Sequence, residues 1–275
     1  MKSSKSWVLG TVSIVAFTIF FLVPFAFIFL IAVKDQQQAA ELSFSWPTHF
    51  QLWQNLKDTI SSRDYILVIA FINSTILTVA SVTIMVILGA MVAYILQRRR
   101  SRLNGLINLL VLSGLIIPPA VVPTIWVLQR LHIFKTLPGL ILVVATFGLA
   151  FCILLFRAFI ATIPRDLDEA AMIDGASPLR IFFRVIFPLL RPVIVTVIVV
   201  QSVVVFSDFV DPLYFLPGDQ NATVQLTLFN FKSQFTQQYN LLFMDILLIT
   251  IPPLIMFLFF NRQIVAGMTS GAVKG

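Results

Sequence analysis

The chain has 275 residues, of which 59% are hydrophobic and 11% are charged, and its formal net charge is +7. Soluble domains contain roughly 45–50% apolar and about 25% charged residues, so this composition excludes a soluble globular domain. The positive charges lie between apolar runs and form no long aromatic–basic stretch, which argues against a nucleic-acid partner and favours loops that carry topology signals.

Six apolar segments predict an all-α, polytopic membrane protein in which residues 1–275 form a single transmembrane domain. A helix needs about 20 residues to cross the hydrocarbon core of the bilayer, and each segment meets that length. The predicted transmembrane helices are 7–33, 66–96, 103–128, 139–163, 185–209 and 241–260. A signal peptide is the alternative for the first segment, but that apolar run exceeds the usual 7–15 residues and no small-residue cleavage site follows.

The segments between these helices refine the topology. Residues 34–65 are mixed and polar, which predicts an extramembrane loop with a short helix near Phe50 to Thr59. Pro118, Pro119 and Pro123 lie in the third span, and because proline removes a backbone donor we expect part of this span to face the bundle interior.

Arginine and lysine cluster in alternate loops. Gln97 to Arg102 and the link between the fourth and fifth spans are rich in arginine, and the positive-inside rule places these regions and both termini in the cytoplasm. The expected location is therefore a bacterial inner membrane. Cys152 is the only cysteine, and His49 and His132 are isolated in connecting segments, so we expect no metal site.

The cytoplasmic link, residues 164–184, predicts two short helices joined by a tight turn. Asp166 and Glu169 have capping-box spacing, Gly175 is suited to a left-handed C-cap, and Ser177-Pro178 can start the second helix. The first helix is too short to be stable alone, yet it carries small and apolar residues. Either the protein's own helix ends cover them or a cytoplasmic partner does, and the flanking charges favour the partner.

This link resembles the EAA loop of ABC importer permeases. Glu169-Ala170-Ala171, Gly175 and Pro188 have the family spacing, although Val185 and Phe187 stand where the family has Ile and Leu. Three further segments resemble the maltose-type subfamily, which imports di- and oligosaccharides. They are Ser207-Asp208-Phe209 with Pro212-Leu213, Thr250-Ile251-Pro252-Pro253, and the ending Gly271-Ala272-Val273-Lys274-Gly275.

The resemblance implies the type I ABC importer (MetI-like) permease fold and a set of partners. These are a homologous second permease, two ATPase subunits, an extracytoplasmic solute-binding protein, membrane lipid and a small-molecule sugar substrate. The chain has no Gly-rich Lys-Ser/Thr phosphate loop, so we expect no cofactor and no catalysis here, with ATP and Mg on the ATPase subunits. The residues implied in coupling to the ATPase are Glu169, Ala170, Ala171, Asp174, Gly175 and Arg180.

Polar residues within spans are costly and often functional. They predict a substrate pathway, for which interhelical hydrogen bonding is the alternative. The pathway candidates are Asn73, Ser74, Gln201, Ser202, Phe206 and Asp208. The extracytoplasmic loop 211–240 is long for a simple connection, and the resemblance implies that it reaches the binding protein through Pro217, Gly218, Asp219, Gln220 and Asn221.

Three other functions stay open. A permease of the same fold for glycerol phosphate or polyamine is one, although a phosphate site would need basic residues within the spans. A membrane enzyme would need a catalytic pair, and no His–carboxylate or Ser–His set is visible in the sequence. A passive channel would leave the cytoplasmic link without a purpose.

Overall fold

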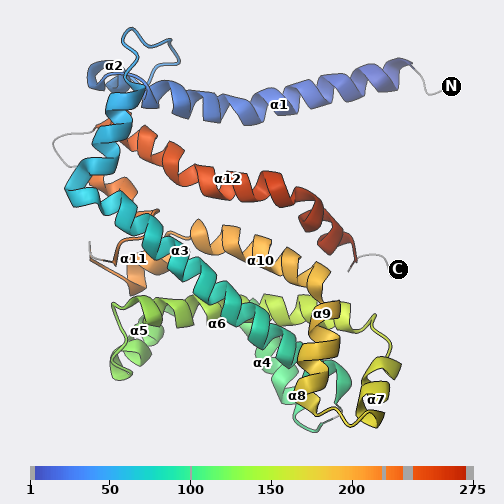
Figure 1. Cartoon of the computed structure of the whole chain (residues 1–275). Coiled ribbons are helices and arrows are strands. Elements are labelled where there is room, and N and C mark those ends of the chain that lie inside the picture. Colours follow the sequence, from blue (N-terminus) through green and yellow to red (C-terminus); the bar gives the residue numbers. More distant parts are fainter. Residues whose placement is uncertain (1–3, 100, 219–220, 232–237, 271–275) are drawn as a thin grey trace. The chain divides into compact units, whose positions relative to one another are not determined.

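The computed structural model describes residues 4–99, 101–218, 221–231 and 238–270, and these residues contain helices and no strand (Figure 1). The predicted all-α class is confirmed. The described elements are α1 (Ser4–Ala32), α2 (Gln36–Ala40), α3 (Leu52–Arg98), α4 (Asn104–Ile116), α5 (Val121–Arg130), α6 (Leu137–Ile160), α7 (Asp166–Ile173), α8 (Pro178–Ile181), the π-helix η1 (Phe182–Ile186), α9 (Phe187–Leu189), α10 (Arg191–Phe206), α11 (Val210–Phe215), the 3-10 helix η3 (Leu226–Phe231) and α12 (Tyr239–Ser270).

Four of these helices are long and apolar enough to cross a membrane, namely α1, α3, α6 and α12. Two further candidates are bent pairs of helices, α4 with α5 at 118° and the segment Pro178–Leu189 with α10 at 76°. If each bent pair counts as one span, the described chain has six candidate spans, the number that the hydropathy predicts.

The third and fifth predicted spans both contain prolines, and both are bent in the structure. The predicted helix 103–128 breaks after Ile116, at Pro118 and Pro119, and the predicted helix 185–209 bends at Leu190, just before Pro192. Proline cannot donate to the preceding turn and clashes with its carbonyl, so a helix bends or ends there. The run of apolar residues continues across each break, which is why hydropathy alone does not reveal it.

Helix α3 also contains a break, at Ser62–Tyr65. The backbone dihedral φ is positive at Arg63, Asp64 and Tyr65, at 45°, 54° and 62°. Left-handed backbone is costly for residues with a Cβ, and here it separates two helical segments. The first segment covers the short helix expected near Phe50, and the second begins where the second span was expected.

The chain divides into two compact units, which we describe separately. The unit formed by Ile69–Thr223 and Pro252–Gly275 has α6 packed against α4, α10 and α11. Small residues allow this close packing. A Cβ added at Gly148 would lie 2.5 Å from Met85 Cε and 3.2 Å from Gln201 Oε1, and one at Gly89 would lie 3.1 Å from Cys152 Cβ.

The other unit, Met1–Val68 with Val224–Ile251, contains a buried group of polar side chains. Asn55 Nδ2 donates to the carbonyl oxygens of Ala32 and Lys34, both at 2.8 Å, and Asn240 Nδ2 donates to Asn55 Oδ1 at 2.9 Å. Lys34 is fully buried, and its Nζ donates to the Ser43 carbonyl at 2.7 Å. We call Lys34, Asn55 and Asn240 the Asn55 cluster. It satisfies carbonyls at the end of α1 that the helix leaves without a partner.

Candidate functional site

Residues 164–184 form two short helices, α7 and α8, joined by a turn at Gly175, and we call this segment the elbow. Gly175 has φ = 74°, in the left-handed region that glycine adopts without steric cost. The turn is closed by two backbone bonds, from Gly175 N to Met172 O at 3.0 Å and from Ala176 N to Ala171 O at 3.0 Å. A glycine-dependent C-cap therefore sets the angle between the two helices.

The expected capping box at the start of α7 is wrong. The N-cap residue is Arg165, it has helical dihedrals, and it makes no side-chain cap bond. Asp166, Asp168 and Glu169 instead lie within the first turn of the helix, where carboxylates interact favourably with the helix dipole. Ser177 has extended backbone before Pro178, as expected, but its side chain makes no cap bond either.

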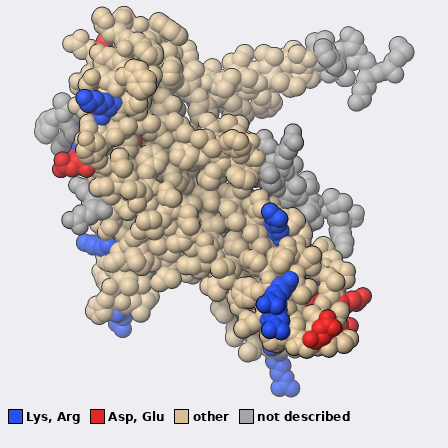
Figure 2. All heavy atoms as spheres, in the orientation of Figure 1, with Lys and Arg blue, Asp and Glu red and all other residues tan. Residues whose placement is uncertain are grey.

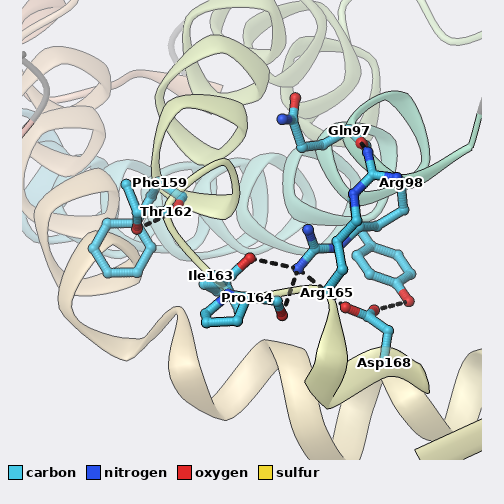
Figure 3. A network of polar contacts seen from close by, with 9 residues as sticks. Gln97, Arg98, Phe159, Thr162, Ile163, Pro164, Arg165 and Asp168 are labelled. Carbon is cyan, nitrogen blue, oxygen red and sulfur yellow. Dashed lines mark hydrogen bonds and ion pairs between the residues drawn. The ribbon is translucent and has the colours of Figure 1, made fainter. Parts of the chain in front are cut away.

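A buried ion pair joins the elbow to the C-terminal end of α3. The Asp168 carboxylate is buried, and its Oδ2 lies 3.0 Å from Arg98 Nη2. Tyr94 Oη donates to Asp168 Oδ1 at 2.6 Å. We call Tyr94, Arg98 and Asp168 the Asp168 latch, and Figure 3 shows Asp168 reaching from the elbow toward Arg98. Hydrogen bonds between ionised groups are short and roughly twice as strong as neutral ones.

Backbone carbonyls extend the Asp168 latch. Arg98 Nη2 also donates to Ile163 O at 3.0 Å, and Arg165 Nη2 donates to Gln97 O at 3.2 Å (Figure 3). Gln97 is in the last turn of α3, where carbonyls lack partners within the helix, and Ile163 follows the end of α6, so guanidinium groups are well placed at both. Arg98 therefore bonds from the end of α3 to the residue just before the elbow, and Arg165 bonds from the elbow back to α3.

Aromatic side chains form a second contact between α3 and the elbow. The Tyr94 ring lies 5.6 Å from the Phe182 ring, and Phe182 in turn packs edge-to-face on Phe183 at 4.9 Å. Ring pairs at these separations add to the area that they bury. Tyr94 therefore contacts the elbow through both its ring and its hydroxyl group.

The elbow carries apolar side chains that the described chain leaves uncovered. Ile173 is 86% exposed, and Met172 and Leu179 are also exposed. Asp and Glu side chains gather beside them at the α7 end of this unit, with Lys and Arg side chains adjacent (Figure 2). Of the apolar residues in α7, Ala171 packs against the core. Self-packing therefore accounts for only part of the apolar surface.

A cavity of about 630 Å³ opens between the elbow and α3. It is lined by side chains of both segments, including Met91, Tyr94, Arg98, Glu169, Met172 and Leu179. The site thus combines an apolar concave surface, an exposed short helix and a carboxylate, Glu169, at its edge. Such a surface is suited to docking against another protein.

The pathway candidates in α3 and α10 lie at helix contacts. Asn73 Nδ2 donates to the carbonyl of Ala222 at 3.1 Å, and Ser74 is buried. Gln201 and Ser202 are buried in α10. Asn73 is thus bonded to a connecting segment, and the pathway role of these residues stays a prediction.

Two other pathway candidates follow at the end of α10. The Phe206 ring lies 6.3 Å from that of Phe71. Asp208 Oδ1 accepts from the backbone N–H groups of Val210 at 3.0 Å and Asp211 at 3.3 Å, the first two residues of α11. Burial, and next the adjacent Asp208, raises the pKa of Asp211 to about 7.

The loop predicted to reach a binding protein is described in part. Pro217 and Gly218 are exposed, while Asp219 and Gln220 lie outside the described residues. Asn221 Nδ2 donates to Lys135 O at 3.2 Å. Asn221 is thereby attached to the segment that follows α5.

Sequence reasoning missed the residues that hold the site together. The positive-inside rule treats Arg98 as a topology signal, and no sequence pattern points to Tyr94 or Asp168. The Asn55 cluster was also missed. Tyr94 and Asp168 are 74 positions apart, and no local pattern predicts such a contact. The available signal was an acidic residue in a short helix on the same predicted side of the membrane as the arginine that ends α3.

Known proteins resemble the chain in both sequence and structure. Residues 85–270 match the family described as "Binding-protein-dependent transport system inner membrane component". The melibiose/raffinose/stachyose import permease protein MelC of Bacillus subtilis is 32% identical over 209 residues, which are 75% of this chain and 76% of that protein. The trehalose transport system permease protein SugB of Mycobacterium tuberculosis is 36% identical over 213 residues, 75% of this chain and 77% of that one.

Solved structures share the fold. A chain of a bacterial ABC transporter that imports the acidic polysaccharide alginate superimposes with a TM-score of 0.81 at 18% identity, covering 95% of this chain and 98% of that one. A chain of the bacterial alginate ABC transporter in complex with a periplasmic protein bound to alginate pentasaccharide gives a TM-score of 0.67 at 15% identity, covering 94% of both chains. At these identities the likeness establishes the architecture.

Proposed function

The chain belongs to the family of binding-protein-dependent transport system inner membrane components, and from that premise we propose that it is the permease subunit through which an ABC importer passes oligosaccharides. It is a multi-pass membrane protein, as its candidate spans indicate. The relatives named for melibiose, raffinose, stachyose and trehalose support a di- or oligosaccharide as the substrate.

One observation carries the energy-coupling part of this proposal. The elbow presents an exposed short helix whose Met172 and Ile173 are uncovered, with Glu169 beside them and Gly175 setting the turn. An isolated helix of this length is marginal in water, and the contacts of Asp168 and Ala171 with the rest of the chain leave its other face uncovered, so we infer that a partner surface covers that face. The partner is one of two separate ATPase subunits, and those subunits bind ATP and Mg. A cleft in the ATPase would receive α7 as a helix in a groove.

The remaining partners follow from the same assignment. A homologous second permease completes the translocation pathway, and an extracytoplasmic solute-binding protein delivers the sugar. The alginate transporter solved with its periplasmic protein supports the latter. With the elbow in the cytoplasm, the positive-inside rule places both termini there as well. The loop around Pro217 and Gly218 then faces the binding protein.

The proposal is tested by purifying the tagged chain from its native membrane and identifying the proteins that remain bound. We expect an ATPase and a second permease. The complex, reconstituted in proteoliposomes with its binding protein, should take up labelled raffinose or trehalose when ATP is present at the ATPase side. Uptake of glycerol 3-phosphate or spermidine instead would replace the sugar assignment. Uptake without ATP would indicate a channel and overturn the importer assignment.

A further inference from the structure

The elbow has two kinds of connection to the transmembrane helices. The polypeptide joins it directly to α6 on one side and, through η1, which begins within the elbow, to α9 and α10 on the other. Helix α3 is remote in sequence and is connected to the elbow only through side-chain contacts, chiefly those of Arg98 and Tyr94. These contacts give the elbow a direct route to α3, beside the indirect route through α6, which packs on α3 at Gly89 and Gly148.

These contacts have the character of a stiff joint. The side chains of Arg98 and Asp168 are 10% and 5% exposed, so water screens their interaction weakly. Arg98 is further bonded to the Ile163 carbonyl, immediately before the elbow. Removing one partner of a buried ion pair leaves the other charge uncompensated. Replacing either Arg98 or Asp168 should therefore disturb the contact between α3 and the elbow.

The other end of α3 is positioned to pass on a displacement. Within one compact unit, α3 runs without a break from Ile69 to Arg98. At ~1.5 Å per residue, Asn73 lies about 37 Å along the helix from Arg98. Asn73 is bonded to the Ala222 carbonyl, next to Asn221, which is attached to the Lys135 carbonyl.

We propose that the Asp168 latch makes α3 the lever that carries the stroke of the elbow across the membrane to the segment at residues 221–222. Tyr94, Arg98 and Asp168 are positioning residues for energy coupling: they bind neither ATP nor sugar, and they couple the docked elbow to a helix that the chain does not join to it. This inference rests on the proposed function. The competing role for the Asp168 latch is a purely structural one, as a fastener that lets the subunit fold.

The two roles predict different results in the reconstituted complex. For Asp168→Asn and Arg98→Gln we expect the ATPase to co-purify and ATP to be hydrolysed within about twofold of the unsubstituted complex. Uptake should fall about tenfold, so that less sugar enters per ATP, because about 1.4 kcal/mol of lost coupling corresponds to that factor. Arg102→Gln is the matched control, since Arg102 is exposed and near the same end of α3. The control should keep the unsubstituted ratio.

If uptake and hydrolysis fall equally in the charge variants, or neither falls, the sugar taken up per ATP is unchanged and the lever role is overturned. If Asp168→Asn and Arg98→Gln do not assemble with the ATPase, Tyr94→Phe distinguishes the two roles. It removes one hydroxyl group and keeps the ring contact with Phe182. We expect Tyr94→Phe to lower the amount of sugar taken up per ATP about threefold. If Asp168→Asn does assemble, adding Tyr94→Phe to it should lower this ratio no further. An unchanged ratio in Tyr94→Phe would reject the proposal. A failed proposed function is recognised separately, because the unsubstituted complex would then show no ATP-driven uptake.

Discussion

The Asp168 latch and the Asn55 cluster both bury polar side chains, but they do so with different chemistry. Asp168 meets a guanidinium and a phenol, so its contacts depend on charge. Asn55 and Asn240 use neutral amides, and the buried Lys34 ammonium donates to oxygens of Ser43 and Ser45. The Lys34 charge is therefore held by neutral oxygens, with no carboxylate in the Asn55 cluster, and we interpret the cluster as a fixed fastener. A charge pair next to a docking surface also responds to charges that a partner brings.

The surfaces near the two regions differ as well. The elbow exposes the aliphatic side chains of Met172, Ile173 and Leu179, whereas the unit that holds the Asn55 cluster exposes Trp46 and Trp53. Tryptophan is enriched where membrane meets water, and aliphatic residues on a short helix are typical of a protein contact. The comparison predicts that changes in the elbow lower the ratio of sugar to ATP beyond any effect on stability. Changes in the Asn55 cluster should alter stability at an unchanged ratio of sugar to ATP.

The largest effect is expected from reversing a charge in the elbow. Glu41 and Glu169 are the two glutamates of the sequence, and both are exposed. We expect Glu169→Lys to lower ATP-driven uptake at least about tenfold, since a reversed charge in a protein interface costs several kcal/mol. Membrane insertion should be normal, as measured by the amount of protein in the membrane fraction. Glu41→Lys is the matched control, and normal uptake by Glu169→Lys would contradict the coupling role.

Removing the central amide of the Asn55 cluster should act on stability. Asn55→Ala leaves the Ala32 and Lys34 carbonyls and the Asn240 amide without their partner. We expect the free energy of unfolding to fall by about 2–4 kcal/mol, the cost of several buried groups that lose hydrogen bonds. Thermal unfolding of the purified protein in detergent measures it. Gln54→Ala, at an exposed neighbour, should change little, and a lowered sugar-to-ATP ratio in Asn55→Ala would break the comparison.

A smaller effect is expected from changing the backbone conformation of the elbow at Gly175. A Cβ added at Gly175 or at Gly105 would meet no atom within 4 Å, so the two positions differ in backbone conformation. Left-handed φ costs a residue with a Cβ roughly 1 kcal/mol, so we expect Gly175→Ala to reduce uptake about fivefold. Gly105→Ala, in a helix, should leave uptake unchanged. Equal uptake by the two variants would show that the turn at Gly175 does not set the docking angle.

The smallest effect concerns pH. The pKa of Asp211 is raised to about 7 by burial and by Asp208, so the folded protein holds this proton more tightly than the unfolded chain does. Its contribution therefore destabilises the fold progressively as pH rises from about 4 to about 7, and it is constant above that. We expect Asp211→Asn to raise the melting temperature at about pH 8 by about 2–4 °C, because partial exposure screens the charge. Near pH 4 the substitution should have no effect.

Asp64→Asn is the control for this measurement. Asp64 is exposed and has left-handed backbone, which asparagine also tolerates. If Asp211→Asn and Asp64→Asn shift the melting temperature equally at each pH, burial of Asp211 is not the cause.

Much of the fold could be predicted because it depends on local composition. Apolar runs indicate helices wherever lipid is the solvent, since a backbone in hydrocarbon must satisfy its own hydrogen bonds. The elbow was predictable for a similar reason, as glycine and proline act within a few residues of their own position. The breaks at Pro118 and after Leu190 were harder, because proline within a span permits a bend without requiring one.

The sequence by itself therefore determined the membrane class, the approximate helices and a short helical elbow with a glycine turn. Only the tertiary structure decided that Asp168 is buried against Arg98 and Tyr94, and that Asn55 bonds to Asn240. Hydropathy and turn propensity are properties of neighbouring residues, whereas an ion pair depends on how distant helices pack. A charged residue in a loop reads the same in sequence whether it faces water or forms the joint between two helices.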